Sequence, residues 1–179
     1  MKKIILMAGI VLSLCCKLNA QHSTHLKWHS LSEAITLNKT TPKKFLIDIF
    51  TDWCGWCKVM DKNTFGHTQI AAIIDKYFYA VKFNAEKDAD VEYKGKTYKL
   101  IKGQNNQNGS HELTSVLMNN QASGYPTICY MDTEMNIIQS ISGYQTPDQI
   151  EPILQFFGSD SYKTIDWTTY TSAFKSELK

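Results

Sequence analysis

Residues 45–58 read Phe45-Leu46-Ile47-Asp48-Ile49-Phe50-Thr51-Asp52-Trp53-Cys54-Gly55-Trp56-Cys57-Lys58. The near-continuous apolar run that opens this segment predicts a buried strand, and the two cysteines follow where the strand gives way to a helix. Unpaired backbone N–H groups and the helix dipole at that point favour a thiolate on Cys54. The segment therefore predicts a nucleophilic Cys54 with an accessible sulfur, able to close a small disulfide ring with Cys57.

The Cys-x-x-Cys spacing has two other interpretations, a structural disulfide and half of a zinc site. Cys129 is the only further cysteine after residue 20, and the histidines offer no zinc-ligand spacing apart from His25 and His29 near the N-terminus. We therefore favour redox chemistry over metal binding. Cys129 lies in an apolar segment, which predicts an inert core residue.

The first twenty residues have the pattern of a secretory signal peptide. Lys2 and Lys3 precede an apolar run, and the segment ends at Ala20 before a polar residue. This pattern predicts cleavage after Ala20, export to the periplasm, and no stable membrane insertion of the remaining chain. Lipoprotein anchoring at Cys15 or Cys16 is the alternative, which is disfavoured because neither cysteine follows Gly, Ala or Ser.

Composition and charge narrow the class of protein. The chain has 179 residues, 43% hydrophobic and 20% charged, so residues 21–179 suit a single domain with its own core. Loss of residues 1–20, which carry three lysines and no acid, changes the net charge from +2 to −1. The chain contains no arginine and its lysines are scattered, which argues against nucleic acid as a partner.

The first half predicts a helix and then a crossover of parallel strands. Ser30 and Glu33 have the spacing of a capping box for the first helix, and residues 65–67 interrupt the helical region after the cysteines. The predicted elements are a helix over 31–38, a strand over 45–50, a helix over 57–63, a helical stripe over 70–77 and a strand over 79–84. This order places Cys54 at the C-terminal end of a strand, where open α/β sheets carry their sites.

The second half predicts a polar insertion and an antiparallel pair of strands. The insertion covers about residues 87–111 and contains a hairpin over 93–98. The elements that follow are a helix over 111–119 and two antiparallel strands over 127–131 and 137–142.

Two helices are predicted at the C-terminal end. Thr146 or Asp148 caps the first, which stops at Gly158, and Pro152 fits only if this helix starts late or bends. Apolar residues at helical spacing predict an extra helix over about 166–178.

Several segments resemble the thioredoxin superfamily, in the order in which the superfamily has them. They are residues 47–58, Val81-Lys82-Phe83-Asn84, Gly124-Tyr125-Pro126-Thr127 and Gly143. The resemblance spans about residues 26–157 and departs mainly at Trp56, where thioredoxin has proline. The chain is most similar to exported bacterial thioredoxin-related proteins and to the C-terminal domains of thiol-disulfide interchange reductases. This implies a thioredoxin-like three-layer α/β/α sandwich with a central mixed sheet, to which the insertion and the last helix are added.

The resemblance implies a role for each residue near the cysteines. Cys54 attacks a substrate disulfide, and Cys57 resolves the mixed disulfide. Asp48, in the buried strand, shuttles protons for Cys57 with a raised pKa, which Lys82 moderates by pairing with it. The alternative for Asp48 is a buried acid satisfied by local hydrogen bonds. The redox-active disulfide is the only cofactor implied.

Five residues are implied to contact substrate or to shape the site. Trp53 and Trp56 form an apolar collar, and Gly55 with Trp56 helps to set the reduction potential. Pro126, cis and facing the disulfide, exposes backbone for strand-like pairing with an extended substrate. Tyr125 contacts substrate or simply packs.

The implied activity is that of an exported thiol-disulfide oxidoreductase, a reductase or isomerase rather than an oxidase. Its expected partners are exported proteins with disulfides or thiols, and a membrane electron donor. Two other functions would use the same cysteines. One is a redox-sensitive partner-binding module that docks through the insertion and the last helix, and the other is an exported metal carrier.

Overall fold

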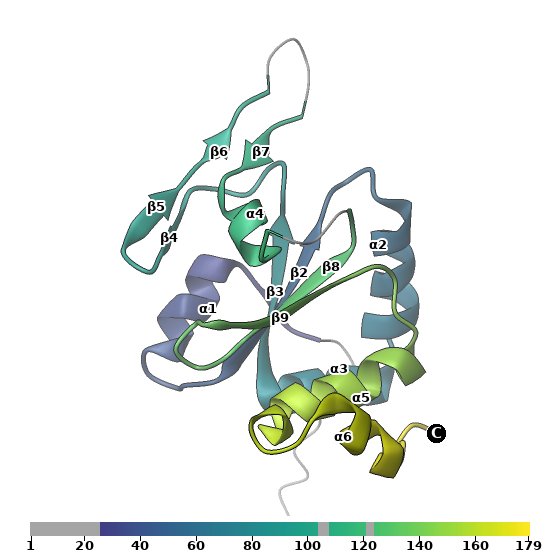
Figure 1. Ribbon diagram of the computed structural model, residues 1–179. Coiled ribbons are helices and arrows are strands. Elements are labelled where there is room, and N and C mark those ends of the chain that lie inside the picture. Colours follow the sequence, from purple (N-terminus) through teal and green to yellow (C-terminus); the bar gives the residue numbers. More distant parts are fainter. Residues whose placement is uncertain (1–25, 104–107, 121–123) are drawn as a thin grey trace, which may run out of the picture.

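A five-stranded sheet in the order β1-β3-β2-β8-β9 forms the centre of the computed structural model, which describes residues 26–103, 108–120 and 124–179 (Figure 1). The predicted signal peptide, Cys15 and Cys16 lie outside these residues. The strands are β1 (Trp28–His29), β2 (Lys44–Phe50), β3 (Phe78–Asn84), β8 (Thr127–Met131) and β9 (Ile137–Ser142). The first three run parallel, whereas β8 is antiparallel to both β2 and β9, so the sheet is mixed as predicted.

Helices cover both faces of this sheet. One face packs against α1 (Leu31–Asn38) and α4 (Leu113–Leu117), and the other against α2 (Gly55–Met60), α3 (Thr68–Tyr77) and α5 (Pro147–Gly158). Side chains of a strand alternate between faces, so Phe45, Ile47 and Ile49 enter the first core while Leu46 enters the second. The predicted three-layer α/β/α sandwich is confirmed.

The chain between β2 and β3 is the predicted parallel crossover. Cys54 is the N-cap of α2, so this helix begins at Gly55, two residues before the predicted start. A π-helical turn over Asp61–Phe65 then separates α2 from α3. The parallel register pairs Lys44 with Phe78 at one end of the strands and Phe50 with Asn84 at the other.

The insertion follows β3 and projects from the end of the sheet where Figure 1 shows β6 and β7. Its predicted hairpin is confirmed: β4 (Val91–Tyr93) pairs with β5 (Lys96–Tyr98) across a turn in which Lys94 and Gly95 have φ of 50° and 75°. A second small pair joins β6 (Leu100–Ile101) to β7 (Ser110–His111). The helix predicted over 111–119 is therefore wrong at its start, because His111 belongs to a strand and α4 begins only at Leu113.

The C-terminal elements differ from the prediction in two details, the position of Pro152 and the length of the last helix, whereas α5 ends at Gly158 as predicted. Pro152 lies inside α5, which begins at Pro147 and so does not start late. Gly158 is the last residue of α5, and its lack of a side chain accommodates Tyr77, since an added Cβ would lie 2.6 Å from the Tyr77 ring. The extra helix, α6 (Trp167–Ala173), is shorter than predicted.

The residues after α6 are hydrogen-bonded to a buried acid of α5, Glu151. Glu151 is fully buried, and its carboxylate accepts hydrogen bonds from the Ser176 hydroxyl and, at 2.7 Å, from the Glu177 N–H. These bonds satisfy a polar group that would otherwise be costly in the core.

Candidate active site

Cys54 lies four residues beyond the end of β2 and forms a disulfide with Cys57. Its backbone N–H donates to the Thr51 carbonyl at 3.1 Å, which fixes the bend between strand and helix. The Cys57 N–H donates to the Cys54 sulfur at 3.1 Å. In the reduced protein this donor would favour an anionic sulfur at the helix N-cap, because hydrogen bonds to charged acceptors are stronger than those to neutral ones.

The expectation of an accessible sulfur is not met in the disulfide form. Cys54 is only 4% exposed and Cys57 only 2%. Both residues lie in the first turn of α2, and the Cys54 sulfur accepts a hydrogen bond from the Cys57 N–H. A partner must therefore approach the sulfur closely, rather than meet it on an open surface.

Asp48 lies on β2 beside Lys82 on β3, because the parallel register pairs the two residues. The Lys82 Nζ donates to Asp48 Oδ2 at 2.6 Å, as predicted. Burial raises the pKa of Asp48 from its ordinary 3.8 to about 6, although the charge of Lys82 opposes this effect. Its other oxygen, Oδ1, has no hydrogen-bond partner among the described residues. Asp48 is thus a carboxyl group that titrates near neutral pH within the core.

Asp61 is a second acid at this site, which the sequence analysis missed. The Lys82 ammonium that binds Asp48 also contacts the exposed carboxylate of Asp61. The same ammonium lies 4.6 Å from the centre of the Trp28 ring. Lys82 therefore joins a buried carboxylate to one in solvent, and the charge of Asp61 further raises the pKa of Asp48. The sequence does contain one signal for this residue: Asp61 lies one helical turn after Cys57, so it is expected on the same side of the helix.

The rim of the site is aromatic. Trp53 and Trp56 are each 62% exposed, and each pairs with a tyrosine. The Trp53 ring lies 5.9 Å from Tyr125 and the Trp56 ring 5.4 Å from Tyr144. Between the tryptophans, Gly55 has no atom within 4 Å of the place a Cβ would occupy. The two tryptophans of the predicted collar are thus exposed, whereas the cysteines next to them in the sequence are buried.

Pro126 lies immediately before β8, and the peptide bond that precedes it is cis. The start of β8 pairs with the end of β2, at Ile49 and Thr127, so Pro126 lies at the same end of the sheet as Cys54. Gly143, with φ of 100°, donates its N–H to the Pro126 carbonyl at 2.8 Å.

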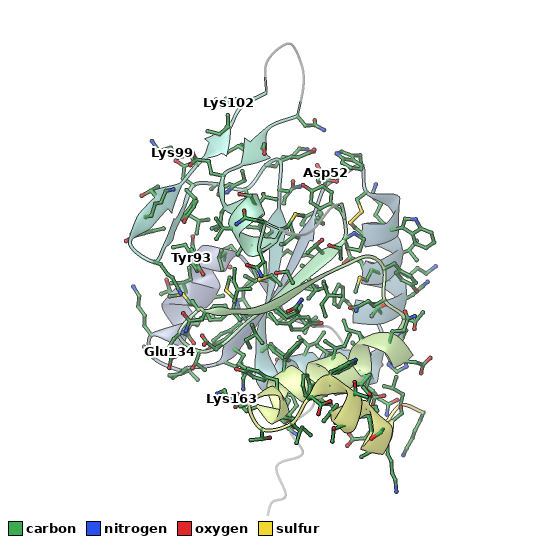
Figure 2. All side chains as sticks on the ribbon, in the orientation of Figure 1. Asp52, Tyr93, Lys99, Lys102, Glu134 and Lys163 are labelled. Carbon is green, nitrogen blue, oxygen red and sulfur yellow. A yellow bond between two sulfur atoms is a disulfide. The ribbon has the colours of Figure 1, made fainter. Side chains whose placement is uncertain are left out.

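Residues 84–87, which lead from the end of β3 into the insertion, contact the loop that leads to Cys54; we call them the root segment. Asn84 donates to Asp52 at 2.8 Å, and Lys87 pairs with the other oxygen of the same carboxylate. The Trp53 indole N–H donates to the Glu86 carboxylate, at 3.0 and 3.1 Å from its two oxygens. Figure 2 shows Asp52 at the end of the sheet from which the insertion projects. These contacts were also missed, because they depend on how the insertion folds.

Cys129 is buried on β8 and is the one free cysteine among the described residues. Burial raises the pKa of its thiol to about 12, so it stays protonated and unreactive, as expected of a core residue. In the parts of the chain that the structure covers, no three His, Cys, Asp or Glu side chains gather as metal ligands would.

Comparison with known sequences assigns the chain to a protein family. The profile of the thioredoxin-like domain matches residues 31–158, which is most of the chain. The chain belongs to the thioredoxin-like family. Together with the Cys54–Cys57 disulfide, this membership identifies the protein as a thiol-disulfide oxidoreductase.

Solved structures of low sequence identity share the fold of this thioredoxin-like protein. A thioredoxin from Thermus thermophilus is 11% identical with a TM-score of 0.54, over 76% of this chain and 92% of that one. The DsbH oxidoreductase is 15% identical with a TM-score of 0.51, over 75% and 85% of the two chains. A thioredoxin-fold protein from Helicobacter pylori is 18% identical with a TM-score of 0.50, over 73% and 79%.

No curated protein matches this thioredoxin-like chain in sequence. Among the helices that the structure describes, none combines the length and the apolar character needed to cross a bilayer.

Proposed function

We propose that the protein is an exported reductase or isomerase of protein disulfides, with Cys54 as the nucleophile and Cys57 as the resolving thiol. The observation that carries the proposal is the Cys54–Cys57 disulfide at the start of α2, the helix that covers the face of the sheet on which Asp48 lies, a buried acid whose pKa is about 6. Such an acid can exchange protons at neutral pH. Export is supported by the signal-peptide pattern of residues 1–20.

The reaction is an exchange of sulfur–sulfur bonds in two steps. In the reduced protein, the Cys54 thiolate attacks one sulfur of a substrate disulfide, so that a mixed disulfide forms and the other substrate sulfur leaves as a thiolate. The Cys57 thiolate then attacks the Cys54 sulfur, which closes the protein disulfide and releases the second substrate thiolate. Two electrons pass from the protein to its substrate, and a membrane electron donor returns them.

Asp48 takes the proton that Cys57 must lose before it can attack. The carboxylate is the base form, so this transfer requires a pH above the Asp48 pKa of about 6. Lys82 holds the carboxylate at 2.6 Å and limits how far burial raises its pKa. Both side chains lie on the face of the sheet that α2 covers, and neither needs to contact the substrate.

The exposed rings of Trp53 and Trp56 receive the substrate on either side of the disulfide, with Tyr125 and Pro126 at the same end of the sheet. Large aromatic surfaces bind varied apolar segments, which suits an enzyme with several protein substrates. The expected partners are exported proteins that carry disulfides or thiols. No bound cofactor is required, because the cysteine pair itself carries the electrons.

Trapping the mixed disulfide tests this proposal. The Cys57→Ser variant should accumulate adducts through Cys54 that vanish with dithiothreitol, whereas Cys54→Ser should form none. Wild-type protein should catalyse insulin reduction by dithiothreitol. If neither adducts nor catalysis appeared, the proposed enzymatic activity would be contradicted, and the redox-sensitive partner-binding module would be the better explanation. Tight, stoichiometric binding of a metal ion by the reduced protein would favour the metal carrier.

The reduction potential of the Cys54–Cys57 pair tests the direction. A value of about −270 mV, as in thioredoxin, would fit a reductase kept reduced by a donor, whereas about −120 mV is typical of a strong thiol oxidant. A value at the oxidising end would reverse the assigned direction.

A further inference from the structure

The root segment is joined to the redox loop by main chain as well as side chains. The Ala85 N–H donates to the Phe50 carbonyl at 2.9 Å, so strand pairing continues past the end of β3. Together with the bonds to Asp52 and Trp53, this contact connects the segment before Cys54 to residues 84–87 at three residues, Phe50, Asp52 and Trp53. Any displacement of the root segment would therefore move the Trp53 ring.

The far end of the insertion returns to hold this same segment. The His111 N–H donates to the Ala85 carbonyl at 2.8 Å. Nearby, Gly109 passes so close to the root segment that an added Cβ would lie 2.9 Å from the Glu86 carbonyl oxygen and 3.1 Å from that of Ile101. A side chain at position 109 could fit only if the Glu86 or Ile101 backbone moved.

The ring of His111 closes the base of the insertion. This side chain is only 1% exposed, and its edge packs on Phe83 at 5.0 Å. Nδ1 accepts from the Leu113 N–H at 3.1 Å, so Nε2 carries the proton and donates to the Ala89 carbonyl at 3.1 Å. One imidazole thus joins the first residues of the insertion to the helix that follows it.

We infer that the insertion is a brace for the substrate-contacting rim, in which His111 and Gly109 are positioning residues for Trp53. The inference rests on the proposed function, in which Trp53 receives the substrate. The brace acts on protein substrates that reach the Trp53 ring. It leaves the sulfur chemistry unchanged, because neither His111 nor Gly109 makes a contact with Asp48, Lys82 or Cys57.

Three variants test the brace. His111→Asn keeps an acceptor for Leu113 but loses the donor to Ala89, Gly109→Ala crowds the root segment, and His111→Gln restores a donor at the place of Nε2. The first two should raise the KM for insulin about fivefold, the effect of losing the hydrogen bond by which Glu86 holds Trp53, with little change in kcat. His111→Gln should recover part of this loss. Reduction of a small aromatic disulfide, 5,5′-dithiobis(2-nitrobenzoate), should stay within twofold of wild type.

The indole N–H resonance of Trp53, assigned with Trp53→Phe, gives a readout that does not depend on activity. It should shift in His111→Asn and Gly109→Ala, and not in the control His29→Asn, whose ring packs on Tyr79. Folded variants with an unshifted resonance and an unchanged KM would overturn the brace, and so would an equal loss of activity on both substrates. If wild-type protein reduces neither substrate, the proposed function fails, while the Trp53 resonance still decides the brace.

Discussion

Replacing Asp48 by asparagine should make the protein more stable at neutral pH. The pKa of Asp48 is about 6 in the folded protein against an ordinary 3.8, so the folded state holds this proton more tightly than the unfolded chain does. Stability is therefore lost as the pH rises from about 4 to about 6. At about 1.4 kcal/mol for each pKa unit, the ionised carboxylate costs about 3 kcal/mol above that range. Asparagine has a similar shape and carries no charge.

Urea unfolding of the oxidised protein measures this effect. Asp48→Asn should exceed wild type by about 3 kcal/mol at pH 8 and by close to zero at pH 4. The matched control, Asp75→Asn, removes an exposed acid from α3 and should change stability by less than about 0.5 kcal/mol at either pH. An equal gain at both pH values, or no gain at pH 8, would refute the reasoning, because only an ionised carboxylate carries the cost.

Three further outcomes are expected. Cys129 should be alkylated only after unfolding, because burial raises the pKa of its thiol to about 12; peptide mapping that finds native labelling would contradict this. Gly158→Ala should lower the free energy of unfolding by about 1–3 kcal/mol, since the new methyl group meets the Tyr77 ring, whereas Gly55→Ala has open space and should not be destabilising. Tyr93→Phe should cost about 1 kcal/mol in urea unfolding, because the Tyr93 hydroxyl donates to a backbone carbonyl at 2.8 Å; an unchanged midpoint would show that water replaces this bond.

Local sequence signals predicted most of the elements of the fold. The helix over 31–38 and the strands over 127–131 and 137–142 have the predicted bounds, since a capping box and a turn between two strands are local features. The helix predicted over 111–119 began too early, because His111 pairs with Leu100 across the insertion. No pattern within the segment itself encodes such a pairing.

The candidate site was predictable where strand register controls it. Asp48 and Lys82 face each other because two parallel strands place them side by side, and the pairing follows from the crossover. The contacts of Asp61 and Glu86 depend on where long side chains reach after folding. Burial of Cys54 was unexpected for the same reason, because it depends on packing around the first turn of α2. The catalytic and substrate-binding roles of these residues stay predictions.

The carboxylate of Glu151 has a consequence for how the molecule opens. Its hydrogen-bond donors come from Ser176 and Glu177, about 25 residues further along the chain, while the acid itself lies inside α5. Peeling away the last residues would remove both donors from this carboxylate, so the tail and α5 should detach together as one cooperative unit. In hydrogen exchange, the Glu177 amide should then share the protection of the α5 interior rather than the rapid exchange usual for a chain end.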